Sequence, residues 1–152
     1  MPRGDEGALD KPERISVGDR FSKKVTFSAE SIRQFADHVG DTNPLHHDDT
    51  VAAASSFGGI IASGTHTFSM MLAAVPDYLA ARQPSLGLEA SVRMRRPVRA
   101  GTTATIEWEI TEISQAPKLK GWIVTMNGRL VRDDGVIALT AVSKSLIYWP
   151  GA

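Results

Sequence analysis

A chain of 152 residues fits one domain with a sizeable core, and the absence of cysteine excludes thiol catalysis, thiolate metal sites and disulfides. Its 17 basic residues balance 17 acidic ones without a long basic run, so the composition supports neither a general nucleic-acid partner nor a membrane-surface partner. No stretch approaches the ~18 apolar residues of a membrane span, and the polar start has no apolar signal core, which predicts a cytoplasmic protein.

The N-terminal segment differs in composition from the rest of the chain. Residues 1–14 mix charge, glycine and proline, which predicts a flexible tail before a single domain over residues 15–152. Residues 20–27 then alternate loosely between apolar and polar side chains, as is typical of a short strand. The apolar side of that strand is formed by Phe21, Val25 and Phe27.

A helical pattern follows this strand. Ser28 is a suitable N-cap, because its hydroxyl can accept a first-turn N–H, and Gly40 stands where glycine commonly ends a helix. The helix therefore delivers Asp41 at its exit. Its apolar stripe is formed by Ile32, Phe35, Ala36 and Val39.

Asp41 and His46 stand five residues apart on a segment that cannot be helical. Pro44 fixes its own φ, lacks a backbone N–H and pushes Asn43 out of the α region, which predicts a turn. A carboxylate and an imidazole held on one turn can share a water molecule and accept its proton. Turn-forming chemistry alone also explains these residue types, so spacing by itself leaves both interpretations open.

Two further helices are expected after this turn. Asp48 or Asp49 can cap a short helix that ends before the glycines at 58 and 59. The longest helical pattern runs from about residue 64 to residue 82 and predicts a buried central helix. Pro76 should kink or shorten this helix, so we expect it to end between Val75 and Ala81. Its apolar stripe is formed by Phe68, Met71, Leu72, Val75 and Leu79.

From Leu86 onward the period of the pattern changes to two, which predicts four strands joined by turns. Asp134-Gly135 indicates a hairpin before a last strand over residues 136–149. One central helix and an antiparallel sheet that buries it form an α+β domain. The clearest alternation comprises Ala104, Ile106, Trp108 and Ile110, and a second comprises Trp122, Val124, Met126 and Leu130.

A metal site is the less favoured interpretation of the histidine-rich turn. Adjacent side chains rarely point at one ion, and the chain lacks the i, i+4 histidine pair of helical zinc sites. We therefore expect no metal and no cofactor. The candidate ligands considered are His46, His47, Asp48 and Asp49.

The turn resembles the hydratase motif of the MaoC-like family of (R)-specific enoyl-CoA hydratases and dehydratases. The similarity extends over about residues 15–149, including the segments 61–67 and 96–101. Two positions depart from the family pattern: Val39 replaces a small or hydroxylated residue, and Ser63-Gly64 replaces a frequent His-Gly pair. The matched motif residues are Phe35, Gly40, Asp41, Asn43, Pro44, Leu45 and His46.

The resemblance implies a single hot-dog domain, in which an antiparallel sheet wraps a long central helix, and a homodimer or higher assembly formed through the sheet. It implies syn addition of water to a trans-2-enoyl thioester, or the reverse, on a CoA or acyl-carrier-protein substrate. Asp41 and His46 would hold the water, with Asn43 supporting their geometry. Gly64 would offer a helix N-terminal N–H to the thioester carbonyl. Ser63 would contact that carbonyl or the water, or would only cap the helix.

Four further residues are candidates for substrate contact. His66 lies in the first turn of the expected central helix, where it either lines the pocket or is a neutral core histidine. Arg93, Arg95 and Arg96, with Arg99, form the densest basic run. Guanidinium groups suit the phosphates of CoA or of a carrier-protein arm, whereas solvated strand and turn charges are the ordinary interpretation.

Three alternative functions would require other residues than a hydratase does. A serine hydrolase is excluded, because Ser63 has no glycine two residues before it and so lacks the nucleophile elbow. A hot-dog thioesterase would use a carboxylate to activate water against the thioester carbonyl. A non-catalytic acyl-binding subunit would not need the Asp41–His46 pair. The Asp-x-Asn-Pro-x-His spacing favours the hydratase over both.

Overall fold

The computed structural model describes residues 9–149. In chain order its elements are β1 (Arg20–Phe27), α1 (Ala29–Val39), η1 (Pro44–His46), α2 (Asp49–Ala54), α3 (Gly64–Ala80), β2 (Ser85–Met94), β3 (Thr102–Ala116), η2 (Pro117–Leu119), β4 (Gly121–Arg132) and β5 (Ile137–Tyr148). This is the expected order of one strand, helices and four strands.

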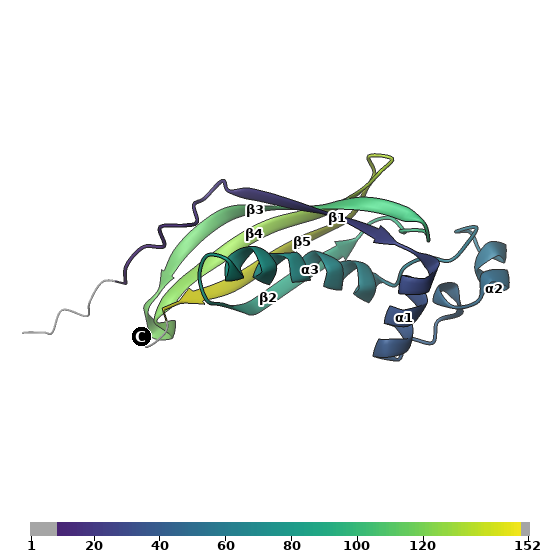
Figure 1. The fold of residues 1–152 in the computed structure, drawn as a ribbon, viewed down its shortest axis with the longest axis horizontal. Helices are drawn as coiled ribbons and strands as arrows, with labels where there is room; N and C mark the ends of the chain where they lie inside the picture. Colours follow the sequence, from purple (N-terminus) through teal and green to yellow (C-terminus); the bar gives the residue numbers. More distant parts are fainter. Residues whose placement is uncertain (1–8, 150–152) are drawn as a thin grey trace, which may run out of the picture.

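The five strands form one antiparallel sheet in the order β1-β3-β4-β5-β2. The sheet curves around α3, which lies along its concave face, while α1 and α2 lie beyond one end of the sheet (Figure 1). This confirms the predicted α+β hot-dog arrangement, with one long helix wrapped by an antiparallel sheet. The two edge strands of the sheet are therefore β1 and β2.

Alternation in β3 positions the central helix. Ala104, Ile106, Trp108 and Ile110 are all buried, and the residues between them are only partly buried. The indole N–H of Trp108 donates a hydrogen bond of 2.9 Å to the carbonyl of Met71 in α3. Burial of this ring and satisfaction of its polar group together fix α3 against the sheet.

The predicted helix caps are confirmed. The side chains of Ser28, Asp48 and Ser63 accept backbone N–H bonds at the starts of α1, α2 and α3. Each oxygen satisfies a donor that the helix itself leaves free. The site loops therefore begin and end at positions that local sequence determines.

One detail of the helices differs from the expectation. Val39 is 50% exposed rather than part of the buried stripe, because α1 ends there, beyond the last turn that packs on the domain. α3 continues past Pro76 and ends at Ala80, within the range expected from the sequence. Val75 and Leu79 are buried on either side of the proline, and their packing favours the helix despite the missing N–H.

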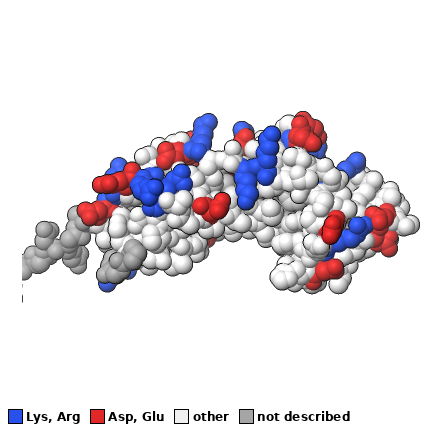
Figure 2. Space-filling view, in the orientation of Figure 1, with Lys and Arg blue, Asp and Glu red and all other residues white. Residues whose placement is uncertain are grey.

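Residues 1–8 of the predicted flexible tail lie outside the described part of the chain. Nearer the domain, the carbonyl of Asp10 accepts a hydrogen bond of 3.0 Å from the Trp122 indole, and Ile15 is buried in the core. Basic and acidic side chains are interspersed on the face shown in Figure 2, in keeping with the balanced net charge. Within residues 9–149, no helix combines the length and apolar character needed to cross a bilayer.

Candidate active site

Asp41 is positioned by the end of α1. Gly40 adopts φ 76°, a left-handed conformation that glycine reaches without steric cost. This turn lets the Asp41 N–H donate to the Ala36 carbonyl at 2.8 Å, while the Gly40 N–H donates to Asp37 at 3.2 Å. The helix end therefore fixes the backbone of Asp41 before its side chain makes any contact.

Two consecutive side-chain turns orient the Asp41 carboxylate. The Asn43 N–H donates to Asp41 Oδ1 at 3.0 Å, and the Leu45 N–H donates to Asn43 Oδ1 at 3.1 Å. Asn43 thus braces the turn through its side chain, as the supporting role predicted for it requires. With Oδ1 engaged, Oδ2 is the Asp41 oxygen that lies nearest His46.

His46 is 6% exposed and its ring is held from one side. Its Nδ1 lies 2.7 Å from the carbonyl oxygen of Ile61. Because a carbonyl only accepts, Nδ1 carries the proton, and Nε2 of the neutral ring carries a lone pair. The Ile61 N–H also donates to the Leu45 carbonyl at 3.2 Å, which ties η1 to the segment just before α3.

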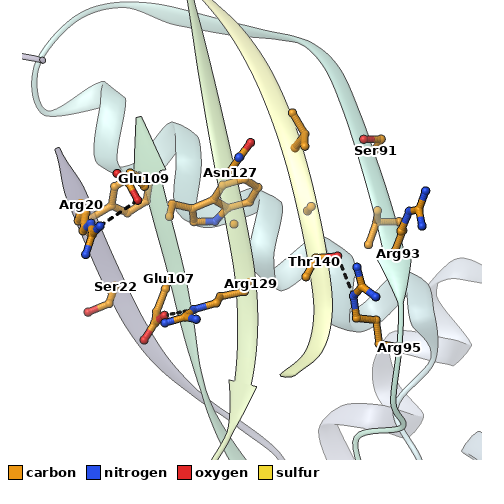
Figure 3. Close-up of a pocket in the computed structure, with 16 residues that line it drawn as sticks. Arg20, Ser22, Ser91, Arg93, Arg95, Glu107, Glu109, Asn127, Arg129 and Thr140 are labelled. Carbon is orange, nitrogen blue, oxygen red and sulfur yellow. Dashed lines mark hydrogen bonds and ion pairs between the residues drawn. The ribbon is translucent and has the colours of Figure 1, made fainter. Parts of the chain in front are cut away.

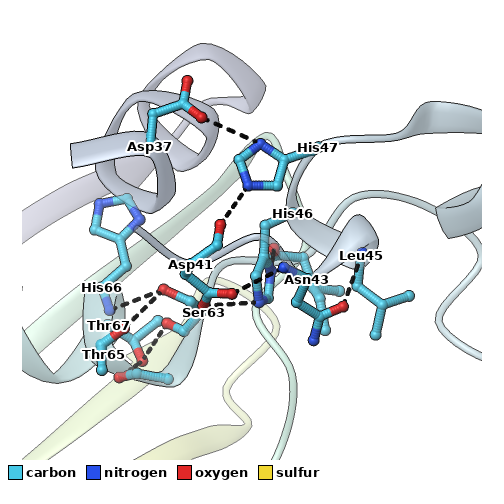
Figure 4. Close-up of polar contacts among 12 residues, drawn as sticks. Asp37, Asp41, Asn43, Leu45, His46, His47, Ser63, Thr65, His66 and Thr67 are labelled. Carbon is cyan, nitrogen blue, oxygen red and sulfur yellow. Dashed lines mark hydrogen bonds and ion pairs between the residues drawn. The ribbon is translucent and has the colours of Figure 1, made fainter. Parts of the chain in front are cut away.

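His46 Nε2 and Asp41 Oδ2 lie 3.6 Å apart, too far for a direct hydrogen bond. A neutral imidazole nitrogen and an ionised carboxylate are both acceptors. A water molecule, which has two O–H donors, is therefore the complementary partner for this pair. Figure 4 shows the two side chains facing one another below α1.

His47 is a part of the site that the sequence did not reveal. Its Nε2 lies 2.6 Å from the Asp41 carbonyl oxygen, and its Nδ1 faces Asp37 Oδ1 at 3.6 Å. Arg33 in turn donates to the His47 carbonyl at 3.2 Å. His47 therefore holds the backbone of Asp41. Its position next to His46 in the sequence does not predict this separate role.

The two histidines of the turn point to different partners: His46 toward Ile61 and the Asp41 carboxylate, His47 toward the Asp41 backbone and Asp37. Among residues 9–149, no three metal-binding side chains converge on one point. The His46 ring thus faces the Asp41 carboxylate, whereas the His47 ring holds the backbone of the turn.

Ser63 caps α3. Its hydroxyl accepts the His66 N–H at 3.1 Å and lies 3.1 Å from the Thr65 hydroxyl. The next residue, Gly64, opens the helix, so its N–H belongs to the first turn and has no intrahelical acceptor. Free N–H groups and the positive end of the helix dipole favour negative charge at this position.

Gly64 also lies against Met94 at the end of β2. A Cβ at position 64 would come within 2.3 Å of Met94 Sδ and 2.5 Å of Cε. Both residues line a cleft of about 260 Å³ together with Thr67, Arg95 and Arg96. The only residue that fits under this Met94 conformation is therefore one without a side chain.

His66 is 6% exposed and lies between aromatic rings. It stacks on Phe35 with centroids 4.5 Å apart, and Phe27 meets it edge-on at 5.2 Å. Within the described chain its Nδ1 is buried without a hydrogen-bond partner. Burial lowers the pKa of His66, and the nearby His46 lowers it further. His66 is therefore a neutral histidine beside the proposed base.

The predicted substrate-binding arginines lie apart from the Asp41–His46 turn. Arg95 and Arg96 line the cleft beside Gly64, whereas Arg93 and Arg95 line a larger hollow on the sheet. The Arg95 Nε donates to the Thr140 hydroxyl at 3.1 Å, and Arg96 donates to the Arg95 carbonyl at 2.7 Å. Arg99 lies against Gly58.

Comparison with known proteins gives consistent matches over most of the chain. The model of the MaoC like domain matches residues 12–127. A "UPF0336 protein" of Streptomyces griseus is 34% identical over 124 residues, covering 76% of this chain and 79% of the relative. An "(R)-specific enoyl-CoA hydratase" of Aeromonas caviae is 29% identical over 132 residues, covering 84% of this chain and 92% of the relative.

The solved structures include an (R)-hydratase from A. caviae involved in PHA biosynthesis. It superimposes with a TM-score of 0.79 at 26% identity, covering 88% of this chain and 97% of that one. The matches thus include a protein named as a hydratase in both sequence and structure, with the same arrangement of sheet and central helix.

Proposed function

The chain belongs to the MaoC-like domain family, and from this premise we propose that it is an (R)-specific enoyl-CoA hydratase. The reaction adds water to a trans-2-enoyl-CoA to give a 3-hydroxyacyl-CoA, or runs in reverse as a dehydration. The observation that carries the proposal is the geometry of Asp41 and His46, two acceptors 3.6 Å apart on a braced turn.

The proposed proton transfers use these two side chains and one water. Asp41 and His46 each accept one O–H of the water, and one of them takes a proton as the oxygen bonds to Cβ. The π electrons of the double bond move toward the thioester carbonyl, and the pair returns a proton to Cα on the same face. The Nδ1–H bond to Ile61 keeps Nε2 basic at the start of this cycle.

The N–H of Gly64 is the proposed donor to the thioester carbonyl. Negative charge develops on that oxygen as water attacks Cβ, and a preoriented first-turn N–H stabilises it more than it stabilises the neutral carbonyl. Ser63 supports this role by capping the same turn. The cleft that Gly64 shares with Met94 is the proposed place of the thioester.

We also propose that the protein is a homodimer formed through β2. Of the two edge strands, β1 carries Arg20, Lys23 and Lys24, which discourage pairing with another strand. The β2 edge instead exposes apolar side chains beside its free backbone groups. Their exposed fractions are 56% for Leu86, 48% for Leu88 and 57% for Met94.

The test of the proposed function is an assay of the purified protein with crotonyl-CoA. Hydration removes the absorbance of the enoyl thioester without releasing a thiol, and chiral analysis of the product should give the (R)-3-hydroxybutyryl thioester. Release of free thiol would instead indicate a thioesterase. Binding without either change would indicate a non-catalytic acyl-binding subunit.

A further inference from the structure

The sheet carries a hollow of about 960 Å³ on the face that points away from α3 (Figure 3). Side chains alternate across a strand, so Glu107 and Glu109 point to the opposite side from Trp108, whose ring is bonded to α3. The hollow spans all five strands and is lined mainly by polar side chains. We call it the outer groove.

The charges of the outer groove are only partly balanced. Arg20 pairs with Glu109 at 3.2 Å, and Arg129 pairs with Glu107. Within residues 9–149 neither Arg93 nor Arg95 has a carboxylate within 4.0 Å, and the side-chain partner of Arg95 is the neutral hydroxyl of Thr140. The β2 side of the groove therefore presents two guanidinium groups without counter-charge.

Arg95 also lines the cleft of about 260 Å³ that contains Gly64 and Met94. Its backbone lies just past the end of β2, where the Arg95 N–H donates to the Ala138 carbonyl at 2.7 Å. Arg95 thus lines both hollows, at the point where the edge strand ends.

Resting on the proposed function, we propose that the outer groove binds the 3′-phospho-ADP end of CoA. The pantetheine arm then runs past Arg95 to the thioester at Gly64. Arg93 lies on β2, Arg95 lies just past its end, and both line the groove. Two guanidinium groups match a ligand with phosphates at two positions, whereas a carrier-protein arm has one phosphodiester.

The remaining groove residues suit a nucleotide. Ser91, Asn127 and Thr140 offer neutral hydrogen-bonding groups between the strands (Figure 3). Pairing of β2 with a second copy would use backbone groups at the edge, so these outward side chains would stay accessible in a dimer.

The experiment compares two thioesters that differ only in the nucleotide, crotonyl-CoA and crotonyl-pantetheine. In the variant Arg93→Gln, which leaves the cleft at Gly64 intact, KM for crotonyl-CoA should rise about tenfold through loss of a charged hydrogen bond. KM for crotonyl-pantetheine and kcat for both should stay as in the wild type. Arg14→Gln, which removes an exposed arginine that does not line the groove, is the matched control and should change neither.

An equal change for both thioesters, or no change for crotonyl-CoA, would overturn the assignment. A KM rise confined to crotonyl-carrier-protein would also overturn it, because the arginines would then serve the carrier. Calorimetry with adenosine 3′,5′-bisphosphate measures binding to the groove independently of the reaction. Binding that Arg93→Gln weakens supports the groove even if the wild type hydrates neither thioester, and absence of binding to the wild type counts against it.

Discussion

The thioether of Met94 lies over Gly64, so that a Cβ at position 64 would come within 2.3 Å of the Met94 sulfur. Met94 is 57% exposed and has a flexible side chain, but it covers the first turn of the helix whose N–H is proposed to face the substrate. Space for Met94 therefore explains glycine at position 64 as well as a catalytic N–H does. The two explanations predict different effects of substitution.

Gly64→Ala should impair the enzyme through the clash, and Gly64→Ala/Met94→Ala should recover most of the activity of Met94→Ala. Alanine keeps the backbone N–H, so only the contact with Met94 is changed. The single substitution should leave the melting temperature nearly unchanged, because the clash is with the exposed, flexible end of Met94, which can turn aside. A double variant as inactive as Gly64→Ala would show that the space over Gly64 is needed for another reason.

The N–H of Gly64 is tested by replacing the amide with an ester at that position by semisynthesis. This change removes the donor and keeps the shape. We expect kcat to fall by ~10²–10³-fold, the usual effect of losing one such donor, with little change in melting temperature. Unchanged kcat in the ester analogue would reduce Gly64 to a packing residue.

His66 should make the fold sensitive to acid. Its pKa is lowered in the folded protein, first by burial and then by His46, so the unfolded chain binds a proton at a higher pH than the folded one. Stability is therefore full above the unfolded pKa of about 6.5 and falls as the pH drops from there through the folded pKa.

This dependence is checked by thermal melts between pH 5 and pH 8 on the wild type and on His66→Phe. The variant should lose less of its melting temperature on acidification, because phenylalanine does not titrate. His38→Gln is the control, since His38 is an exposed histidine on α1. The same slope in wild type and His66→Phe would exclude His66 as the acid-sensitive group.

The apolar edge of β2 predicts the dimer interface. Leu86→Lys/Leu88→Lys should convert a dimer to a monomer, because two charges would have to be buried beside the pairing strand. Val17→Lys removes an equally exposed apolar residue away from β2 and should leave the mass unchanged. The measurement is the molar mass from light scattering. A monomeric wild type would contradict the proposed dimer, and a double-lysine variant that remains dimeric would contradict β2 as its interface.

Local sequence was sufficient for most of the fold. The alternation around Trp108, the caps at Ser28 and Ser63, and the glycine at the end of α1 each act within a few residues, so they could be predicted without the structure. The burial of Val39 was mispredicted because the end of α1, not the local pattern, determines it.

The site is less predictable because its decisive contacts join distant segments. The Ile61 carbonyl that fixes the His46 ring lies 15 residues along the chain, and Met94 is 30 residues from Gly64. The brace from His47 to the Asp41 carbonyl depends on the shape of the turn rather than on spacing. The sequence could place the candidate groups on the same turn, but it could not give the orientation of either histidine.

The most direct test of the account measures kcat for hydration of crotonyl-CoA by Asp41→Asn, His46→Gln and the double variant. Asparagine can still accept the Asn43 N–H, and glutamine can still donate to Ile61, so circular dichroism and melting should report an intact fold. Each single change should lower kcat by ~10²–10⁴-fold. The kcat of the double variant should be only slightly below that of the less active single variant, because both groups act on one water. Activity within a few-fold of the wild type in either single variant, with hydration still giving the (R) product, would contradict the mechanism.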